Sequence, residues 1–455
     1  MSTLDRSLTT RLVGRPSRET AAAWAGRWTR TVAIAMTVAV PVMVNPWGNP
    51  DAYIIPKVAV LLSLTAALVI GWGISWLLAR EPRWRLTVPE IPLWAYLLFV
   101  LLSSSLSFSP LQTFFGIEWR YEGLLVIFTY ALLFFVGVHF FGSSSGFRAL
   151  ITAASIAALV VIAFGLLQLF RPPLFGGEAQ MRLWYETIGA PRIGSLIGSP
   201  VEFGGYLCVV TPLLLALGLA GTGRGRFVWL GGATLGVAAL MMTLTRAAWL
   251  GIAAGAAVFA VAAGAAPLRR HRLELVAMAA ALAVILTGLV MAFVTPQRMA
   301  HRATSAVAMG SGSGGQRVYI WQGTAALIRQ RPILGWGPET LALVFPYDVS
   351  SQVKHFGLGA IIIDRAHNDV LQVAVSNGIL GAAAYVVFWA LVTLAAVRVW
   401  RRATGSTRII AAGWLAALFG YLVQVQFSFS AVSYTPLVWL LAGSAAGSES
   451  EGREN

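Results

Sequence analysis

The segment Asp364-Arg365-Ala366-His367-Asn368-Asp369-Val370-Leu371-Gln372 leads directly into a largely apolar run from Val373 to Val397. This run is long enough to cross the hydrocarbon core of a bilayer as an α-helix. The polar residues before it place a histidine and an Asn-Asp pair at the boundary between lipid and water. Because titratable groups are costly at the mouth of a membrane helix, His367 is a candidate for function.

The composition identifies a polytopic membrane protein. Of the 455 residues, 57% are hydrophobic and only 11% are charged. Apolar runs predict twelve spans in total, at 31–48, 55–78, 92–108, 122–141, 148–170, 199–220, 227–245, 247–266, 274–295, 367–397, 409–427 and 429–446. Lipid offers the backbone no hydrogen-bond partners, so each span is expected to be helical and the fold class all-α.

Basic residues predict how these spans are oriented. The first 30 residues carry several arginines, lead into a run of full spanning length, and are not expected to be a cleaved signal peptide. With both termini in the cytoplasm, most of the 33 lysines and arginines fall on cytoplasmic segments. We therefore expect a cytoplasmic tail at 1–30, one transmembrane domain at 31–446, a long extracytoplasmic loop at 296–366 between the ninth and tenth spans, and a cytoplasmic tail at 447–455.

The formal net charge of +15 is explained by this topology, because arginines at helix ends meet anionic lipid headgroups. No nucleic-acid partner is therefore expected. The single cysteine, Cys208, lies in an apolar segment, which excludes an internal disulfide and argues against Cys/His metal chemistry. The acidic residues show no Asp-x-Asp or calcium-loop spacing, so we expect neither a metal site nor a cofactor.

Three arginines are predicted on the same extracytoplasmic face as His367. Arg192 precedes the sixth span, Arg246 separates the seventh from the eighth, and Arg317 follows the tract 310–315. Guanidinium groups bind phosphate oxygens in a bidentate manner, so a cluster of them at an apolar boundary favours an anionic ligand. The alternative for each arginine is simple interfacial snorkelling. In the long loop we expect a flexible hinge at 310–315 and a short amphipathic helix at roughly 317–330.

Taken in order along the chain, these motifs resemble the O-antigen ligase superfamily. They are Pro56-Lys57, Arg120-Tyr121-Glu122-Gly123, Arg192 with Gly194 and Ser199-Pro200, Thr243-Leu244-Thr245-Arg246 with Trp249-Leu250-Gly251, Arg317 with Trp321, Arg331-Pro332-Ile333-Leu334-Gly335-Trp336-Gly337, and His367-Asn368-Asp369 with Leu371-Gln372. The chain departs from the family at Ser199-Pro200-Val201, where Asn-Pro-Asn is frequent, and at Thr245-Arg246-Ala247, where Ser-Arg-Gly is frequent.

The resemblance implies a GT-C-like membrane glycosyltransferase. Members take a glycan from an undecaprenyl-diphosphate carrier and pass it, without a metal and with inversion, to a hydroxyl acceptor at the outer face of the bacterial cytoplasmic membrane. By this resemblance His367 accepts the acceptor's proton, and Arg246 and Arg317 stabilise the leaving diphosphate. Arg192, Asn368 and Gln372 are implied to join Arg246 and Arg317 in substrate binding.

The acceptor is the open question within this family. We favour an O-antigen ligase acting on lipid A-core. The alternatives are an O-antigen or surface-polysaccharide polymerase acting on a growing glycan, and a protein O-oligosaccharyltransferase acting on Ser or Thr. From other classes, an anion transporter would favour inverted repeats or broken helices in mid-membrane, and a non-catalytic scaffold would tolerate loss of both His367 and Arg246. A monomer in contact with membrane lipids is expected.

Overall fold

The computed structural model describes residues 18–45, 47, 51–80, 84–170, 192–293, 312–347 and 362–454. Within these ranges every regular element is a helix and no strand is present, which confirms the all-α class. The alternation of long apolar runs with short polar connections explains this outcome, because a helix satisfies its backbone hydrogen bonds within one segment.

Each predicted span coincides with a long helix in the described part of the chain. These helices are α1 (Arg18–Val42), α2 (Ile54–Leu78), α3 (Glu90–Ser105), α5 (Leu124–Phe140), α6 (Ser144–Leu167), α8 (Pro200–Ala220), α9 (Arg226–Met242), α10 (Arg246–Ala263), α12 (Arg272–Phe293), α17 (Asp369–Arg402), α18 (Gly405–Gln426) and α19 (Thr435–Glu454). Seven are long and apolar enough to cross a membrane, whereas α3, α5 and α9 are apolar but shorter. Twelve crossings remain a prediction.

Further elements, all but one of them short, lie in the connections among these helices. They are α4 (Pro110–Phe115), the 3₁₀ turn η1 (Ser195–Ile197), α11 (Ala265–Arg270), α14 (Gly312–Gln330) and α15 (Leu341–Val344). The helix expected at roughly 317–330 is therefore present as α14. The predicted hinge differs from the structure, because residues 312–315 already form the first turn of α14, while Gly310 and Ser311 lie outside the described residues.

Several helices continue beyond the apolar runs from which they were predicted. Helix α1 begins at Arg18, inside the segment expected as a tail, and α17 continues to Arg402. At the start of α1, Arg18 donates a hydrogen bond to Leu77 O and Glu19 forms an ion pair with Arg80. Hydropathy marks where a segment can be in lipid, so it misses polar turns that are stabilised by contacts with a neighbouring helix.

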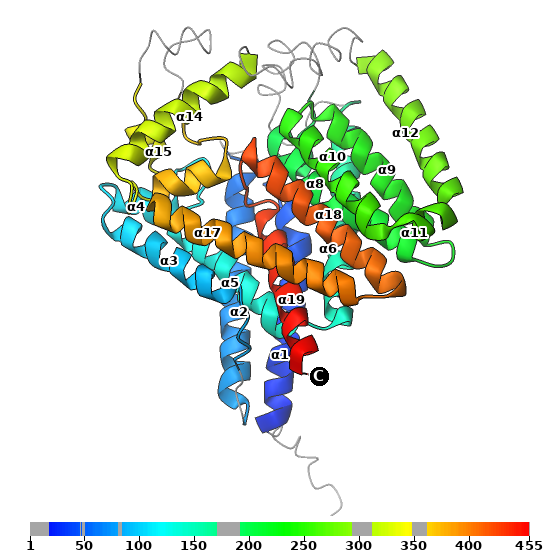
Figure 1. Cartoon of the computed structure of the whole chain (residues 1–455), viewed down its shortest axis with the longest axis horizontal. Helices are drawn as coiled ribbons and strands as arrows, with labels where there is room; N and C mark the ends of the chain where they lie inside the picture. Colours follow the sequence, from blue (N-terminus) through cyan, green and yellow to red (C-terminus); the bar gives the residue numbers. More distant parts are fainter. Residues whose placement is uncertain are drawn as a thin grey trace, which may run out of the picture.

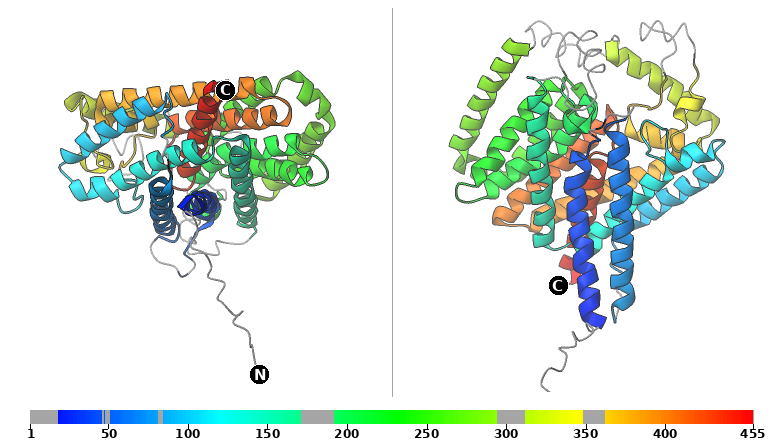
Figure 2. Two further views of the ribbon diagram at one scale, coloured as in Figure 1. Left: turned by 90° about the horizontal axis from the view of Figure 1, so that it is seen from below. Right: turned by 180° about the vertical axis from the view of Figure 1, so that it is seen from behind.

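The helices form one bundle in which α8 is the most enclosed membrane-length helix. Helices α1 and α2 lie side by side and extend below the rest of the bundle (Figures 1 and 2). Helix α18 packs against α8 and α10, α17 against α3, and α19 against α5. Glycines allow the closest of these approaches: a Cβ atom on Gly251 of α10 would lie 2.7 Å from the carbonyl oxygen of Gly420 of α18.

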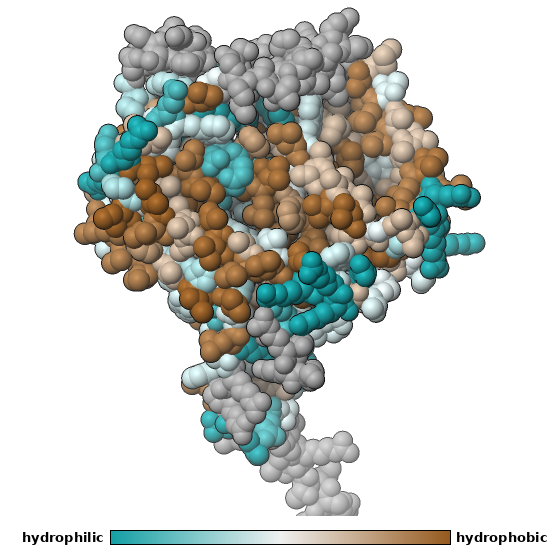
Figure 3. All heavy atoms as spheres, viewed as in Figure 1, coloured by the Kyte–Doolittle hydropathy of each residue, from teal (hydrophilic) through white to brown (hydrophobic). Residues whose placement is uncertain are grey.

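The outside of the bundle is suited to lipid. Apolar residues cover much of the middle of the face shown in Figure 3, with hydrophilic residues at its lower margin and right edge. Helix α12 has no buried residue, and large apolar side chains such as Leu273, Val284 and Met291 are exposed. Exposed apolar surface on this scale is typical of a protein surrounded by a bilayer.

A second, smaller hydrophobic core lies under α14 and α15. It is formed by Ile320, Leu327, Leu341, Phe345, Ile363, Ala366 and Val375. This core joins α14 and α15 to the segment that precedes α17 and to the first turns of α17 itself. The described part of the long loop is therefore packed onto the bundle beside His367.

Contacts between connections follow the alternation predicted from the basic residues. Segments predicted on the outer face contact one another, as in the ion pair between Arg120 and Glu339. Segments predicted on the cytoplasmic face do the same, as in the pairs Arg226–Glu274 and Arg398–Glu449. The predicted outer connections thus meet at one end of the bundle.

Candidate functional site

His367 lies immediately before α17, in a short segment whose backbone is held on both sides. Its φ angle of 51° is in the left-handed region, which is uncommon for a residue other than glycine. Asn368 caps the helix, its Oδ1 accepting a hydrogen bond from the N–H of Leu371 at 2.9 Å. The Oε1 atom of Gln372 accepts one from the N–H of Ala366 at 2.9 Å. Asn368 and Gln372 thus support the histidine, and their predicted contact with substrate stays a prediction.

Helix α17 is broken at Gly378, where φ is 76° and ψ is 173°. The loop after α14 supplies partners for the backbone groups at the break. The three bonds run from Trp336 N–H to Val375 O (2.9 Å), from Gly337 N–H to Ser376 O (2.9 Å), and from Ile379 N–H to Pro332 O (2.7 Å). Because protein backbone fills the break, this interruption does not offer the open helix ends that an ion site in a transporter uses.

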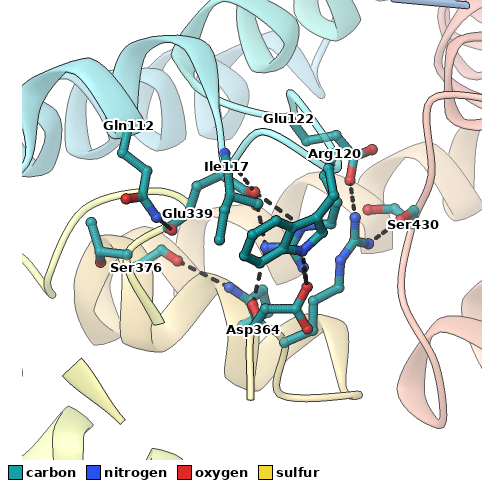
Figure 4. A network of polar contacts seen from close by, with 12 residues as sticks. Gln112, Ile117, Arg120, Glu122, Glu339, Asp364, Ser376 and Ser430 are labelled. Carbon is teal, nitrogen blue, oxygen red and sulfur yellow. Dashed lines mark hydrogen bonds and ion pairs between the residues drawn. The ribbon is translucent and has the colours of Figure 1, made fainter. Parts of the chain in front are cut away.

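A buried arginine, Arg120, joins Glu339 to Asp364, which lies three residues before His367 in the sequence (Figure 4). Its Nε and Nη2 atoms donate hydrogen bonds to Glu339 Oε2 at 3.1 and 2.9 Å. The same Nη2 donates to the carbonyl oxygen of Asp364 at 3.0 Å, and Nη1 lies 3.3 Å from Asp364 Oδ2. Trp119 Nε1 donates to the same Asp364 carboxylate oxygen at 2.8 Å. Although burial raises the pKa of Asp364, Arg120 and the neighbouring Arg365 more than offset it, and the pKa is lowered.

A second buried ion pair joins Arg365 to Glu122, which precedes α5. Tyr130 donates a hydrogen bond to Glu122 at 3.0 Å, and Arg365 donates to the carbonyl oxygen of Ser430 at 2.5 Å (Figure 4). The guanidinium of Arg365 also lies 4.2 Å from the ring centre of Phe429. Burial lowers the pKa of Arg365, but Glu122 and the other nearby carboxylates outweigh it, and the pKa is raised above its usual value. Arg365 is therefore a permanent charge that is neutralised inside the protein.

A cavity of about 100 Å³ adjoins these ion pairs, because Glu122, Arg365 and Glu339 are among the residues that line it. Its lining includes Glu122, His367, Asp369, Asn377, Ser428 and Trp439. Asp369 accepts a hydrogen bond from the Tyr385 hydroxyl at 2.6 Å, and the Asn377 amide nitrogen is buried without a partner in the described structure. The cavity is small and its lining mixes apolar side chains with several polar ones, which suits a reacting group or a few water molecules better than a whole glycan.

Two of the predicted arginines meet through the turn that precedes α10. Arg192 Nε donates a hydrogen bond to Thr243 O at 2.8 Å, and its Nη2 donates to Thr245 Oγ1 at 3.1 Å. Arg246 follows Thr245 directly and is the first residue of α10. Arg192 therefore holds the turn from which Arg246 projects, and its own contact with a substrate stays a prediction.

Arg317, on α14, connects these arginines electrostatically to the histidine. Burial and then the charge of Arg246 lower the pKa of Arg317. Burial and then Arg317 lower the pKa of His367 to about 4, and Asp364 opposes this effect. The structure thus brings Arg317 near enough to both Arg246 and His367 for its charge to interact with each of them, although three separate segments carry these residues. His367 is accordingly neutral at pH 7.

Backbone strain is concentrated around these residues. The described residues other than glycine with positive φ are Tyr121, Ser195, Leu244, Glu339 and His367. His367 and Glu339 belong to the candidate site, and the other three lie within three positions of Arg120, Arg192 or Arg246. Strained backbone persists where the surrounding structure enforces it, and it clusters at functional sites.

The sequence pattern selects the arginines and the histidine as candidates but does not indicate the buried ion pairs. Arg120 and Glu122 belong to one of the motifs of the resemblance, and no role is predicted for Glu339, Asp364 or Arg365. A signal was present, because charged residues beside membrane spans in a chain with few charges need partners. The partners could not be assigned, because they are more than two hundred residues apart in the sequence.

Comparison with known proteins adds one finding. Residues 231–386 match the family model described as O-antigen ligase. This segment contains Arg246, Arg317 and His367 but neither Arg120 nor Arg192. The resemblance predicted from the sequence is confirmed over this segment. No match to the chain was found among curated proteins.

Proposed function

From the O-antigen ligase segment at residues 231–386, we propose that this protein is a lipid-linked oligosaccharide glycosyltransferase. It transfers a glycan from an undecaprenyl-diphosphate carrier to a hydroxyl of lipid A-core, with inversion and without a metal. The observation that carries the proposal is that Arg317 interacts electrostatically both with Arg246 and with His367 at one end of an apolar bundle.

The arginines form the donor half of the proposed site. A diphosphate carries negative charge, and more charge develops on it as its bond to the glycan breaks. Guanidinium groups bind phosphate oxygens bidentately and keep their charge when partly buried. Arg246 and Arg317 would therefore interact more strongly with the diphosphate in the transition state than in the bound donor, and such a difference is the condition for catalysis. Their positive charges take the place of the cation that many enzymes use on such groups.

His367 forms the acceptor half. In the proposed step the acceptor oxygen attacks the anomeric carbon, the bond from that carbon to the diphosphate oxygen breaks, and the electron pair leaves with the diphosphate. The proton of the acceptor hydroxyl passes to an imidazole nitrogen of His367. The lowered pKa of His367 keeps the imidazole neutral and able to accept this proton at physiological pH. Because the acceptor attacks from the side opposite the leaving group, the configuration at the anomeric carbon is inverted.

The predicted topology places this site at the outer face of the bacterial cytoplasmic membrane, with both termini in the cytoplasm. The contacts between the predicted outer connections, Arg120–Glu339 and Arg365–Glu122 among them, support a common side for these segments. A donor with a polyprenyl tail would then keep its tail in the bilayer and present its diphosphate at the level of Arg246. We propose that one copy of the chain suffices for transfer.

The activity is tested with purified protein in lipid vesicles and an undecaprenyl-diphosphate-linked O-antigen repeat as donor. Lipid A-core, a second lipid-linked repeat and a serine-containing protein are offered separately as acceptors, each with and without excess chelator. Transfer to lipid A-core in the presence of chelator is the expected result. Transfer only to another acceptor would replace the ligase by a polymerase or a protein transferase, and a strict need for added magnesium or manganese would overturn the metal-free mechanism.

The role of His367 is tested separately from binding. His367→Ala should lower kcat by about a hundred- to ten-thousandfold, the effect typical of losing acid–base assistance. Donor binding should be retained, because it rests on the arginines. A variant that loses donor binding but keeps its turnover per bound donor would make His367 a ligand of the diphosphate instead of a base.

A further inference from the structure

We propose that Arg120 is a positioning residue: held by Glu339, it fixes the segment 364–366 and thereby sets where the His367 imidazole lies. The inference rests on the proposed function, since it assigns Arg120 to the same reaction. Arg120 lies outside the segment that matches the O-antigen ligase family.

The geometry around Arg120 is that of a clamp with several contacts. One guanidinium binds the Glu339 carboxylate through two nitrogens and binds Asp364 through both its carbonyl oxygen and its side chain. The backbone N–H of Ile117 also faces the Glu339 carboxylate, at 3.5 Å, and Gln112 Nε2 donates to the Glu339 carbonyl at 2.6 Å (Figure 4). Arg120 and Glu339 are 6% and 8% exposed. Removing one partner would leave the other as a buried, uncompensated charge.

Only two residues, Arg365 and Ala366, separate His367 from Asp364, the residue that Arg120 contacts. Arg365 is fixed by Glu122, and the carbonyl oxygen of Ala366 accepts a hydrogen bond from Trp321 Nε1 at 2.9 Å. Every residue from 364 to 366 is therefore held by a group from another element. If Asp364 is displaced, Arg365 and Ala366 are held by their own partners, so the change in backbone conformation is taken up mainly at His367, the next residue with a strained backbone.

Strain at both ends of the clamp explains why an arginine is needed. Glu339 has φ of 62° and His367 has φ of 51°, conformations that a free loop of these residues would avoid. A guanidinium has donors in a rigid planar fork and can bind a carboxylate and a carbonyl together. A lysine at this position would keep the charge but could not hold both segments in one orientation.

The competing interpretation is that Arg120 only stabilises the fold. Both interpretations predict a less stable protein when Arg120 is replaced, so stability does not distinguish them. They differ in how the loss of activity depends on His367. A positioning residue acts through the imidazole and has nothing to position once the imidazole is gone, whereas a structural residue would lower activity to the same extent with or without it.

The experiment is a double-mutant cycle with Arg120→Gln and His367→Ala, measured with the lipid-linked O-antigen repeat and lipid A-core. In the parent background, Arg120→Gln should lower kcat about a hundredfold, as expected for misplacing a reacting group by about 1 Å. The KM for the donor should stay unchanged. In the His367→Ala background the same replacement should change kcat less than about twofold. Arg120→Lys should recover only a small part of the loss.

Two further variants keep the result decisive. If Arg120→Gln does not fold, the paired replacement of Arg120→Gln and Glu339→Gln removes both buried charges and keeps groups that can hydrogen-bond; it should fold and still lose kcat. Arg398→Gln, which breaks an ion pair at the other end of α17, should leave kcat unchanged. A parent-like kcat in the folded Arg120 variant or the paired variant would overturn the proposal.

The same cycle separates failure of the positioning role from failure of the proposed function. Equal losses from Arg120→Gln in both backgrounds would make Arg120 structural while leaving the base intact. Full activity of His367→Ala would instead remove the base, and the positioning role with it.

Discussion

Ion pairs between an arginine and a glutamate lie near both ends of α17, in different settings. Near its first residue, which we call the site end, Arg120 and Glu339 are both buried, Arg120 also contacts Asp364, and the backbone of Glu339 and His367 is strained. Near its last residue, Arg398 has a side chain that is 45% exposed and pairs with Glu449 beside a regular helix end. Buried pairs are costly to form and cost still more when broken. The site end therefore uses buried charge to hold a strained backbone, whereas the pair at the other end joins a partly exposed arginine to a buried glutamate beside regular helix.

After the replacement of His367 itself, the largest effect is expected from Arg317, the arginine of α14 whose charge acts on His367. Arg317→Ala should lower kcat/KM about a hundred- to thousandfold, the range found when one stabilising donor is removed from a transition-state anion. Arg317→Lys should recover little, because a lysine lacks the bidentate geometry. Donor binding and transfer are measured in the same vesicles. Unchanged transfer in the Ala variant would remove Arg317 from the mechanism.

A smaller effect is expected at Gly378, which divides the site end of α17 from the rest. Gly378→Ala should destabilise the protein by about 1–3 kcal/mol from the left-handed backbone alone, and by more because a Cβ atom would clash with Ile333 O. The matched control is Gly405→Ala: Gly405 has φ of 54° with no atom near its Cβ position. Thermal unfolding in detergent should show a clearly larger loss for Gly378→Ala. Equal losses of stability would mean that residues 332–337 rearrange easily to make room for the added Cβ atom.

The pH dependence of the rate should report the charges around the site end. In the free protein, burial and Arg317 lower the pKa of His367 to about 4, so kcat/KM should rise with pH through an ionisation near that value. A bound diphosphate adds negative charge beside Arg317 and stabilises the imidazolium. The ionisation seen in kcat should therefore lie at higher pH than the one seen in kcat/KM. Coincident profiles would show that the donor's charge does not reach His367.

The smallest effect on transfer is expected at the other end of the helix. Arg398→Gln removes the partly exposed member of a pair whose other member, Glu449, is buried. Stability should fall, because a buried carboxylate loses a partner, and transfer should be unaffected. A loss of transfer with retained stability would show that the two ends of α17 are coupled.

Long apolar runs predicted every long helix that the structure describes in the bundle, because a membrane helix forms from interactions within its own segment. The same local reasoning selected His367, Arg246 and Arg317, since a charged or titratable side chain beside an apolar run needs a reason to be there. It was weaker at helix ends: Arg18 and Arg402 lie in polar turns that neighbouring helices stabilise, and hydropathy does not register such contacts.

Only the tertiary structure decided which charges meet. Arg120 and Glu339 are paired across more than two hundred residues, as are Arg365 and Glu122, and many other pairings of the same residues would satisfy charge balance. The break at Gly378 was likewise invisible in the sequence, because it exists only where residues 332–337 supply hydrogen bonds to the interrupted helix. Local spacing determines which residues share a helix, but distant backbone and side chains determine which strained conformation a residue such as His367 can hold.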